Sequence, residues 1–129
     1  GNQVSASICP ANFRLPSGMS GSGGATTNGT VYTAADFPVL NASMNAGSLT
    51  TGATTNYPTG WQPSGAWGGA FSGYWNVGLG YQGSYGYYWS STVNSATNAR
   101  ILFFYSSAVS PGNGISDKYN GFAVRCVLP

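Results

Sequence analysis

The chain has two cysteines, and they stand near its opposite ends. Cys9 follows Ile8, and Cys126 precedes Val127, so each has an apolar neighbour. A bridge between them would tie the two termini together. In the chain-entropy model, closing a loop of nearly the whole chain stabilises the fold by roughly 4 to 5 kcal/mol. The alternative is a pair of unrelated buried thiols.

The composition predicts one compact domain over residues 1–129. Apolar residues make up 42% of the chain and aromatic residues 15%. A chain of this size buries roughly two-thirds of its surface on folding. Gly, Ser, Thr and Asn are abundant, but the aromatic residues interleaved with them argue against disorder. Because helix-favouring Glu, Lys and Gln are scarce or absent, we expect a loop-rich, mostly β domain.

Formal charges are few, which excludes several kinds of partner. The net charge is +2, from four basic residues and two acidic residues. Such sparse charge provides no basic patch for a run of phosphates, so nucleic acid is not expected as a partner. No stretch reaches the ~20 apolar residues of a membrane span, so we expect no membrane insertion by this segment.

The residues for catalysis and metal binding are largely missing. Histidine and glutamate are absent, which removes the usual general bases and imidazole ligands. Nothing in the pattern pairs Asp36 with Asp117, and we interpret them as a helix-end charge and a turn residue. The Ser90–Thr92 hydroxyls lack a base to activate them and are interpreted as structural. We therefore expect no enzymatic activity, no cofactor and no metal.

The first part of the chain predicts one helix among loops. Residues 4–9 favour a short strand, and residues 17–30 predict a Gly/Ser/Thr-rich surface loop. Residues 33–44 have helical spacing, with Thr33 as a candidate cap and Pro38 tolerable in the first turn. The apolar face of this helix comprises Phe37, Leu40 and Met44.

The middle of the chain, over residues 47–86, consists almost entirely of turn formers and aromatic residues. A structureless segment of this length is improbable unless its own side chains pack it, and its tryptophans, Trp75 included, are the expected internal anchors. The last third predicts an antiparallel meander. Its strands are expected over 87–92, 99–105 and 121–127, with turns over 94–98 and 111–114.

Short motifs follow one another in a defined order along nearly the whole chain. They are Cys9-Pro10, Phe13-Arg14-Leu15-Pro16, Tyr88-Trp89-Ser90-Ser91-Thr92, Asn98-Ala99, Leu102, Phe104, Val109, Pro111 and Gly121-Phe122-Ala123-Val124-Arg125-Cys126. Their joint order resembles the Fibrobacter-type major paralogous domain, a family of bacterial surface domains. The closing half is also similar to the variable proteins of diversity-generating retroelements, which display targeted sequence variation in a ligand-binding face.

Both resemblances imply an α+β, C-type-lectin-like fold: an antiparallel sheet with one or two short helices and long packed loops. They also imply that the terminal strands lie side by side, as a Cys9–Cys126 disulfide requires. Arg14 and Arg125 would bind loop carbonyls near the joined ends or pair with an aspartate. With so few carboxylates, the calcium-dependent sugar site of animal C-type lectins is not expected.

The resemblances further imply a secreted or cell-surface protein of bacterial or phage origin. The chain would be a trimmed mature domain or part of a longer surface polypeptide. The low content of charged residues and the high content of Tyr, Ser, Thr and Asn fit an extracytoplasmic location.

A candidate ligand-binding face follows from side-chain alternation in the second strand of the meander. Leu102 and Phe104 would point inward, so the residues between and beside them would point to the other face. That face either binds a ligand or is covered by residues 47–86. Residues 73–86 have the Tyr/Ser/Gly/Asn composition of antibody loops, although a packed Ω-loop would look similar. The candidate site residues are Asn76, Leu79, Tyr81, Tyr85, Ile101, Phe103, Tyr105, Asn113 and Ile115.

These observations favour a non-enzymatic recognition domain that binds a protein or a glycan, and that could be a diversified retroelement variable protein. The alternative is a structural or adhesive module of a fimbrial or surface protein, whose same face packs against neighbouring domains. A distant similarity of the implied fold to formylglycine-generating enzymes suggests a third hypothesis, that the chain is an enzyme. Those enzymes need reactive cysteines or a metal, whereas both thiols here are expected to pair with each other.

Overall fold

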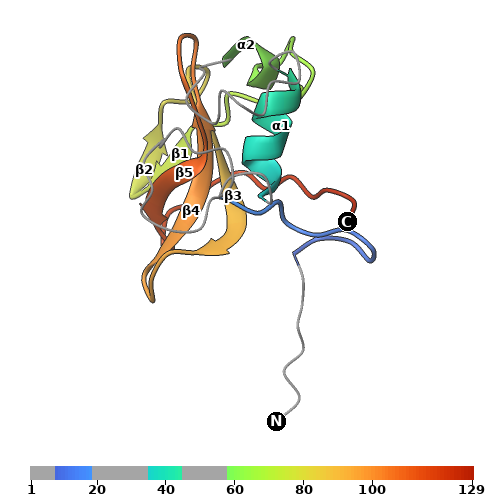
Figure 1. Ribbon diagram of the computed structural model, residues 1–129. Helices are drawn as coiled ribbons and strands as arrows, with labels where there is room; N and C mark the ends of the chain where they lie inside the picture. The colour runs from blue at the N-terminus through green and yellow to red at the C-terminus, as the bar shows by residue number, and fades with distance from the viewer. Residues whose placement is uncertain (1–7, 19–34, 45–57) are drawn as a thin grey trace.

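The computed structural model describes residues 8–18, 35–44 and 58–129 of the chain, which form an α+β fold with two small antiparallel sheets (Figure 1). No helix among these residues is long and apolar enough to span a membrane. The elements are α1 (Asp36–Met44), α2 (Pro58–Trp61), β1 (Tyr74–Asn76), β2 (Gly78–Gly80), β3 (Gly86–Val93), β4 (Asn98–Phe104) and β5 (Val109–Asp117).

The larger sheet is an antiparallel meander in the order β3-β4-β5, and β1 and β2 form a separate hairpin. The first two strands of the predicted meander are confirmed, but its third strand was placed wrongly. Residues 111–114, predicted as a turn, lie inside β5. The pairing with β4 jumps by two residues between Pro111 and Gly114, so the Gly and Asn between them form a β-bulge.

The end of the chain is not the regular strand predicted over residues 121–127. It makes isolated bridges to three different segments, so it forms no continuous ladder with any one strand. The bridges are Gly121 to Trp75, Ala123 to Tyr88 and Val127 to Arg14. Of the strand predicted over residues 4–9, only residues 8 and 9 are described, and they form a bend.

Helix α1 forms where the apolar spacing predicts it. Phe37 is buried, and Leu40 and Met44 pack against the same cluster. Pro38 lies in the first turn, where a missing N–H removes no helical hydrogen bond. The predicted cap Thr33 and most of the predicted loop 17–30 lie outside the described residues.

The core lies between α1, α2 and the inner face of the sheet. Three of its rings, those of Phe37, Trp61 and Trp67, meet edge to face with centroids 5.2 to 6.1 Å apart. The buried Trp61 indole donates a hydrogen bond to Asn41 Oδ1 at 2.9 Å. The two tryptophans therefore anchor the segment, as predicted. The core cluster is Phe37, Trp61, Trp67, Tyr88, Leu102, Phe104 and Val109.

The two ends of the described chain are joined covalently and by backbone pairing. Cys9 and Cys126 form a disulfide with their Cα atoms 5.7 Å apart, which confirms the expected bridge. Arg14 and Val127 exchange two backbone hydrogen bonds, of 2.9 and 2.8 Å. The Arg125 guanidinium donates to the carbonyl of Trp67 and lies 4.2 Å from the centroid of its ring.

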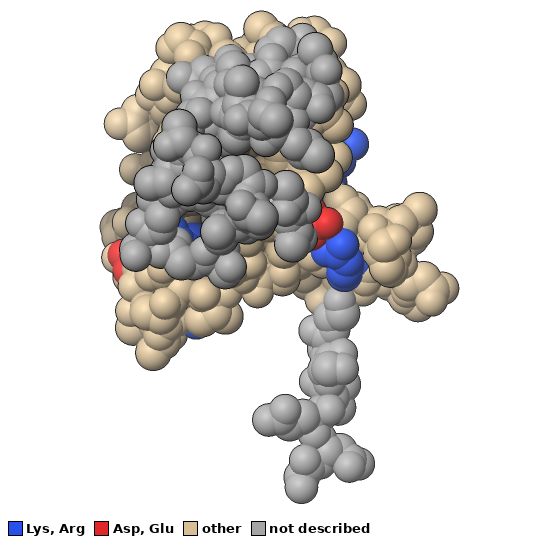
Figure 2. Space-filling model, viewed as in Figure 1, with Lys and Arg blue, Asp and Glu red and all other residues tan. Residues whose placement is uncertain are grey.

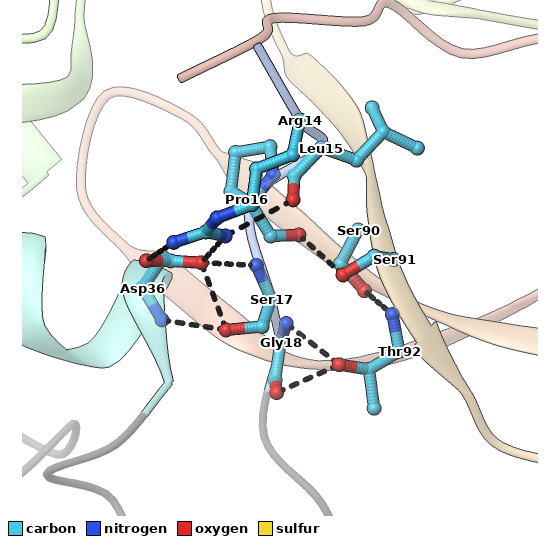
Figure 3. A network of polar contacts seen from close by, with 9 residues as sticks. All are labelled: Arg14, Leu15, Pro16, Ser17, Gly18, Asp36, Ser90, Ser91 and Thr92. Carbon is cyan, nitrogen blue, oxygen red and sulfur yellow. Dashed lines mark hydrogen bonds and ion pairs between the residues drawn. The ribbon is translucent and has the colours of Figure 1, made fainter. Parts of the chain in front are cut away.

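Asp36 connects α1 to the segment around Arg14 (Figure 3). Its carboxylate accepts hydrogen bonds from both terminal nitrogens of the Arg14 guanidinium, and from the backbone N–H and the hydroxyl of Ser17 at 2.6 and 2.9 Å. The Ser17 hydroxyl oxygen in turn accepts from the Asp36 N–H. The hydrogen bond from Arg14, helped by those from Ser17, lowers the pKa of Asp36 from 3.8 to about 2.

The same segment is fastened to β3 by hydroxyl groups (Figure 3). Thr92 Oγ1 donates to the carbonyl of Gly18 at 3.0 Å and accepts from its N–H. The N–H and the hydroxyl of Ser91 both donate to the carbonyl of Pro16, at 2.9 and 3.4 Å. Ser90 Oγ donates to the carbonyl of Arg100 on β4 at 2.7 Å. Each of these bonds ties backbone segments together, which fits the structural interpretation of the three hydroxyls.

We expect reduction of the Cys9–Cys126 disulfide to lower the free energy of unfolding by about 4 to 5 kcal/mol, because the bridge closes a loop of nearly the whole chain. Guanidinium unfolding with and without dithiothreitol measures this loss. As a control, the Cys9→Ser/Cys126→Ser variant should start less stable and lose nothing more in the reductant. An unfolding midpoint that does not move on reduction contradicts the prediction.

Asp36→Asn should lower the free energy of unfolding by about 1 to 2 kcal/mol near neutral pH, because it removes the Arg14 ion pair. The folded-state pKa of Asp36 is depressed, so its stabilisation is complete above the unfolded-state pKa of about 3.9 and is lost as pH falls toward about 2. Urea unfolding across this window should show the gap between wild type and variant closing.

Arg14→Gln removes the same ion pair and supplies the matching control. The double variant should lose little more stability than Asp36→Asn alone, because Asp36→Asn already removes the ion pair through which Arg14 acts. A stability gap that stays unchanged in acid would show that Asp36 acts through something other than its charge.

Candidate functional site

The outer face of the sheet, opposite the core, carries a second set of aromatic side chains. Tyr87 on β3 pairs with Phe103 on β4, and both side chains are half-buried. Their neighbours Tyr88 and Leu102 point the other way, into the core. Adjacent residues of a strand face opposite sides of the sheet. One face of β3 and β4 therefore contributes side chains to the core, and the other face contributes side chains to the candidate site.

These rings form one continuous group, which we call the outer aromatic layer. Its neighbouring ring centroids lie 4.6 to 6.4 Å apart. Tyr87 lies at its centre and contacts rings of Tyr74, Tyr85, Phe103 and Phe122. The layer comprises Tyr74, Tyr81, Tyr85, Tyr87, Trp89, Phe103, Tyr105 and Phe122.

An open pocket of about 310 Å³, which we call the outer pocket, lies within this layer. A Cβ atom at Gly114 would come within 2.9 Å of Ile101 Cγ1, so the pocket wall is close-packed where Gly114 of β5 pairs with Ile101 of β4. None of the described residues that line it is charged. They are Tyr74, Asn76, Tyr87, Ile101, Phe103, Gly114, Ile115, Ser116, Asn120 and Phe122.

The pocket also holds an incompletely bonded amide. Asn120 Nδ2 donates to Ser116 Oγ at 2.8 Å, while Asn120 Oδ1 is buried and finds no hydrogen-bond partner in the described part of the chain. An unsatisfied buried acceptor costs roughly 1 to 3 kcal/mol. Turning the carboxamide over only exchanges the unsatisfied atom for the other one.

The tyrosines of the layer affect one another. Burial raises the pKa of Tyr87 above its ordinary value of 10.0, and the neighbouring Tyr85, Tyr74 and Tyr81 raise it further. The Tyr87 phenol therefore stays protonated and uncharged well above neutral pH. Figure 2 shows only a few charged groups among the described residues that are in view.

Most of the predicted site residues come together here. Asn76, Ile101, Phe103 and Ile115 line the outer pocket, although Ile101 is only 4% exposed and serves as its floor. Residues from the 47–86 segment cover part of this face, since Tyr74 and Tyr85 lie against Tyr87 and Tyr105, and the pocket itself stays open. Tyr81, Tyr85 and Tyr105 belong to the aromatic layer beside the pocket.

Two predicted residues belong neither to the outer pocket nor to the outer aromatic layer. Asn113 lies in the β5 bulge, where its Oδ1 accepts from the Ser110 hydroxyl and its carbonyl accepts from Arg100 Nη1 at 2.9 Å. Its groups are thus used to hold the bulge. Leu79 is exposed on β2, where it pairs with Trp75.

The prediction that Trp75 is an internal anchor was wrong, because this side chain is 53% exposed. Its neighbours in β1, Tyr74 and Asn76, both line the outer pocket. Alternation therefore turns Trp75 to the opposite side of the hairpin.

Several lining residues were missed by the sequence analysis. Tyr87 could have been found, because the alternation that placed Phe103 outward applies equally to β3. Asn120 and Phe122 had no such signal, since they follow a turn and reach the pocket only through the irregular path of the chain end. The missed residues are Tyr74, Tyr87, Gly114, Ser116, Asn120 and Phe122.

The β1–β2 hairpin has an exposed apolar tip. Val77, between the two strands, is 95% exposed and has a φ of 63°, in the left-handed region that β-branched residues rarely adopt. Trp75 and Leu79 flank it as an exposed cross-strand pair. Within the described residues, nothing explains why a strained position at a turn should carry an apolar side chain.

Val77→Asn should raise the free energy of unfolding by up to about 1 kcal/mol, because Asn tolerates a positive φ far better than a β-branched residue. Thermal unfolding measures the change. Val93→Asn is the matched control, since Val93 is also an exposed valine but has no positive φ. If Val77→Asn is no more stable than Val93→Asn, the backbone at the tip is not strained.

No group of three or more His, Cys, Asp or Glu residues that could hold a metal ion occurs in the described ranges. No protein-family model, curated protein or solved structure matches this chain.

Proposed function

We propose that this chain is a non-enzymatic recognition domain, and that the outer pocket and the outer aromatic layer bind a protein or a glycan on another surface. The observation that carries the proposal is an open pocket, lined by aromatic and neutral polar side chains, on the sheet face that the core does not use. Aromatic side chains offer large contact area at small entropic cost, and amides and hydroxyls add directional hydrogen bonds.

The surroundings of the pocket suit binding by a preformed site. Tyr87 and Phe103 come from paired strands and stack on each other with an angle of 26° between their planes. Phe122 also packs against Tyr87, with an angle of 22° between their ring planes. Side chains held by one another lose little freedom when a ligand arrives, so more of the contact energy appears as affinity.

A wider kinship is also part of the proposal. We assign this chain to a C-type-lectin-like domain related to the Fibrobacter-type major paralogous domain and to retroelement variable proteins. The order of its sequence motifs supports this assignment, as do the bridged chain ends and the packing of helix α1 beside an antiparallel meander. The disulfide also supports a secreted or cell-surface location, because such bonds persist in oxidising compartments.

We also propose that the domain has no enzymatic activity. Both cysteines are joined to each other, so neither offers a thiolate for catalysis. The Ser90 and Thr92 hydroxyls donate to backbone carbonyls, as structural side chains do.

A structural or adhesive module remains the second candidate, and the β1–β2 hairpin favours it. The exposed Trp75, Val77 and Leu79 form an apolar surface whose side chains do not line the outer pocket. Contact with a neighbouring domain of a longer surface protein would bury such a surface.

Replacing exposed residues of the site should remove ligand binding without unfolding the domain. We expect the Asn76→Ala/Tyr81→Ser/Ile115→Ser variant to lose at least about tenfold in affinity, with a Tm close to that of the wild type, because these side chains are exposed. Binding of the purified domain to glycan and protein arrays, followed by titration with the ligand found, measures the effect. Phe103 and Tyr105 are left intact because they are half-buried.

The matched control is Trp75→Ser/Leu79→Ser on the opposite side of the hairpin. It should keep the array ligand if the outer pocket is the binding site. If the control loses the ligand and the pocket variant keeps it, the domain works through the hairpin surface, as the structural module requires.

A further inference from the structure

The outer pocket has room for a single ring. Its volume of about 310 Å³ stands at the lower end of the range of about 300 to 1,000 Å³ that small-molecule sites occupy. Its lining includes Tyr87, Phe103 and Phe122, and the planes of the two phenylalanine rings lie within 26° and 22° of the Tyr87 plane. The C–H groups on the face of a sugar ring suit the electron-rich faces of such aromatic rings.

The polar groups of the pocket are numerous and neutral. Asn76 on β1, Ser116 on β5 and Asn120 in the following turn contribute two amides and a hydroxyl. One carboxamide atom of Asn120 has no hydrogen-bond partner among the residues that the structure describes, so this side chain loses few hydrogen bonds when it turns toward a ligand. A ligand hydroxyl both donates and accepts, and can therefore satisfy that amide in either orientation.

A charged ligand does not fit this lining. None of the described lining residues carries a charge to pair with it, and the Tyr87 phenol stays neutral as well. Moving a charged group out of water without a partner is costly, so a carboxylated sugar or a phosphate would be rejected. A tyrosine side chain of a protein has a ring and one hydroxyl, which would leave most of the amide and hydroxyl groups of the pocket without a partner.

We propose that the outer pocket binds one neutral pyranose ring of a glycan directly, by ring stacking and by hydrogen bonds from Asn76, Ser116 and Asn120, without a metal ion. This inference rests on the proposed recognition function and names its ligand class. No acidic residue lines the pocket in the described part of the chain, so the sugar hydroxyls meet amides and hydroxyls rather than a bound cation.

Saturation-transfer NMR on the full chain tests the ligand class. The probes are glucose, galactose, mannose and N-acetylglucosamine, with glucuronic acid as the charged sugar and N-acetyltyrosinamide as the mimic of a protein side chain. We expect at least one neutral sugar to bind with a dissociation constant in the millimolar range, equally well in EDTA. Glucuronic acid and N-acetyltyrosinamide should bind at least about tenfold more weakly than that sugar.

Two variants and one control locate the binding. Asn76→Ala and Asn120→Ala should each weaken sugar binding by about threefold to tenfold, because each removes a hydrogen-bonding amide from the pocket. Asn94→Ala changes an equally exposed amide outside the pocket and should leave affinity unchanged. Asn76 is exposed on a hairpin, so its variant gives a result even if the Asn120 variant fails to fold.

The outcomes separate this inference from the proposed function. Binding of N-acetyltyrosinamide without a neutral sugar, sugar binding that EDTA abolishes, or sugar binding that ignores Asn76 would each overturn the pyranose site. So would the absence of any sugar binding. In those cases the recognition function stands if the array ligand still depends on Asn76, Tyr81 and Ile115, and it fails if that dependence is absent as well.

Discussion

Side-chain alternation along β3 and β4 is the constraint from which the rest of the architecture follows. Tyr88, Leu102 and Phe104 turn inward and meet Phe37 of α1 within the tryptophan-rich core. Tyr87 and Phe103 turn outward and begin a second aromatic layer, which β1, β5 and the end of the chain complete. Two strands thus supply both the stability and the candidate site, and changes on one face leave the packing of the other largely untouched.

The chain ends supply the support that a domain with so little helix needs. The segment around Arg14 is bonded to the disulfide, to Val127, to Asp36 at the start of α1 and, through Ser17 and Gly18, to the region of Thr92 on β3. These contacts are polar and covalent, whereas the core is aromatic. The sparse charge of the protein is therefore concentrated where it fixes the backbone, and the candidate site is left neutral.

The parts of the fold that could be predicted are those with a local signal. The spacing of Phe37 and Leu40 predicts α1, and the alternation in residues 101–105 predicts which side chains face outward. The turn predicted over residues 111–114 was wrong because Pro, Gly and Asn occur in β-bulges as well as in turns. The burial predicted for Trp75 was wrong although large apolar residues are usually buried. Asn120 and Phe122 reach the pocket through long-range contacts that no local pattern encodes.

The bulge in β5 has two extra residues, and the pairing with β4 resumes directly after them. Ser110 before it and Gly114 and Ser116 after it pair with Phe103, Ile101 and Ala99, all on the outer side of β4. Because directly paired residues share one face of the sheet, both halves of β5 contribute to the same surfaces. A bulge residue has no partner on the facing strand, so loss of one of the two would leave a single-residue bulge and keep Ser116 opposite Ala99, with its side chain at the pocket. Length can therefore vary at this point of the chain without a change of register in the rest of the strand.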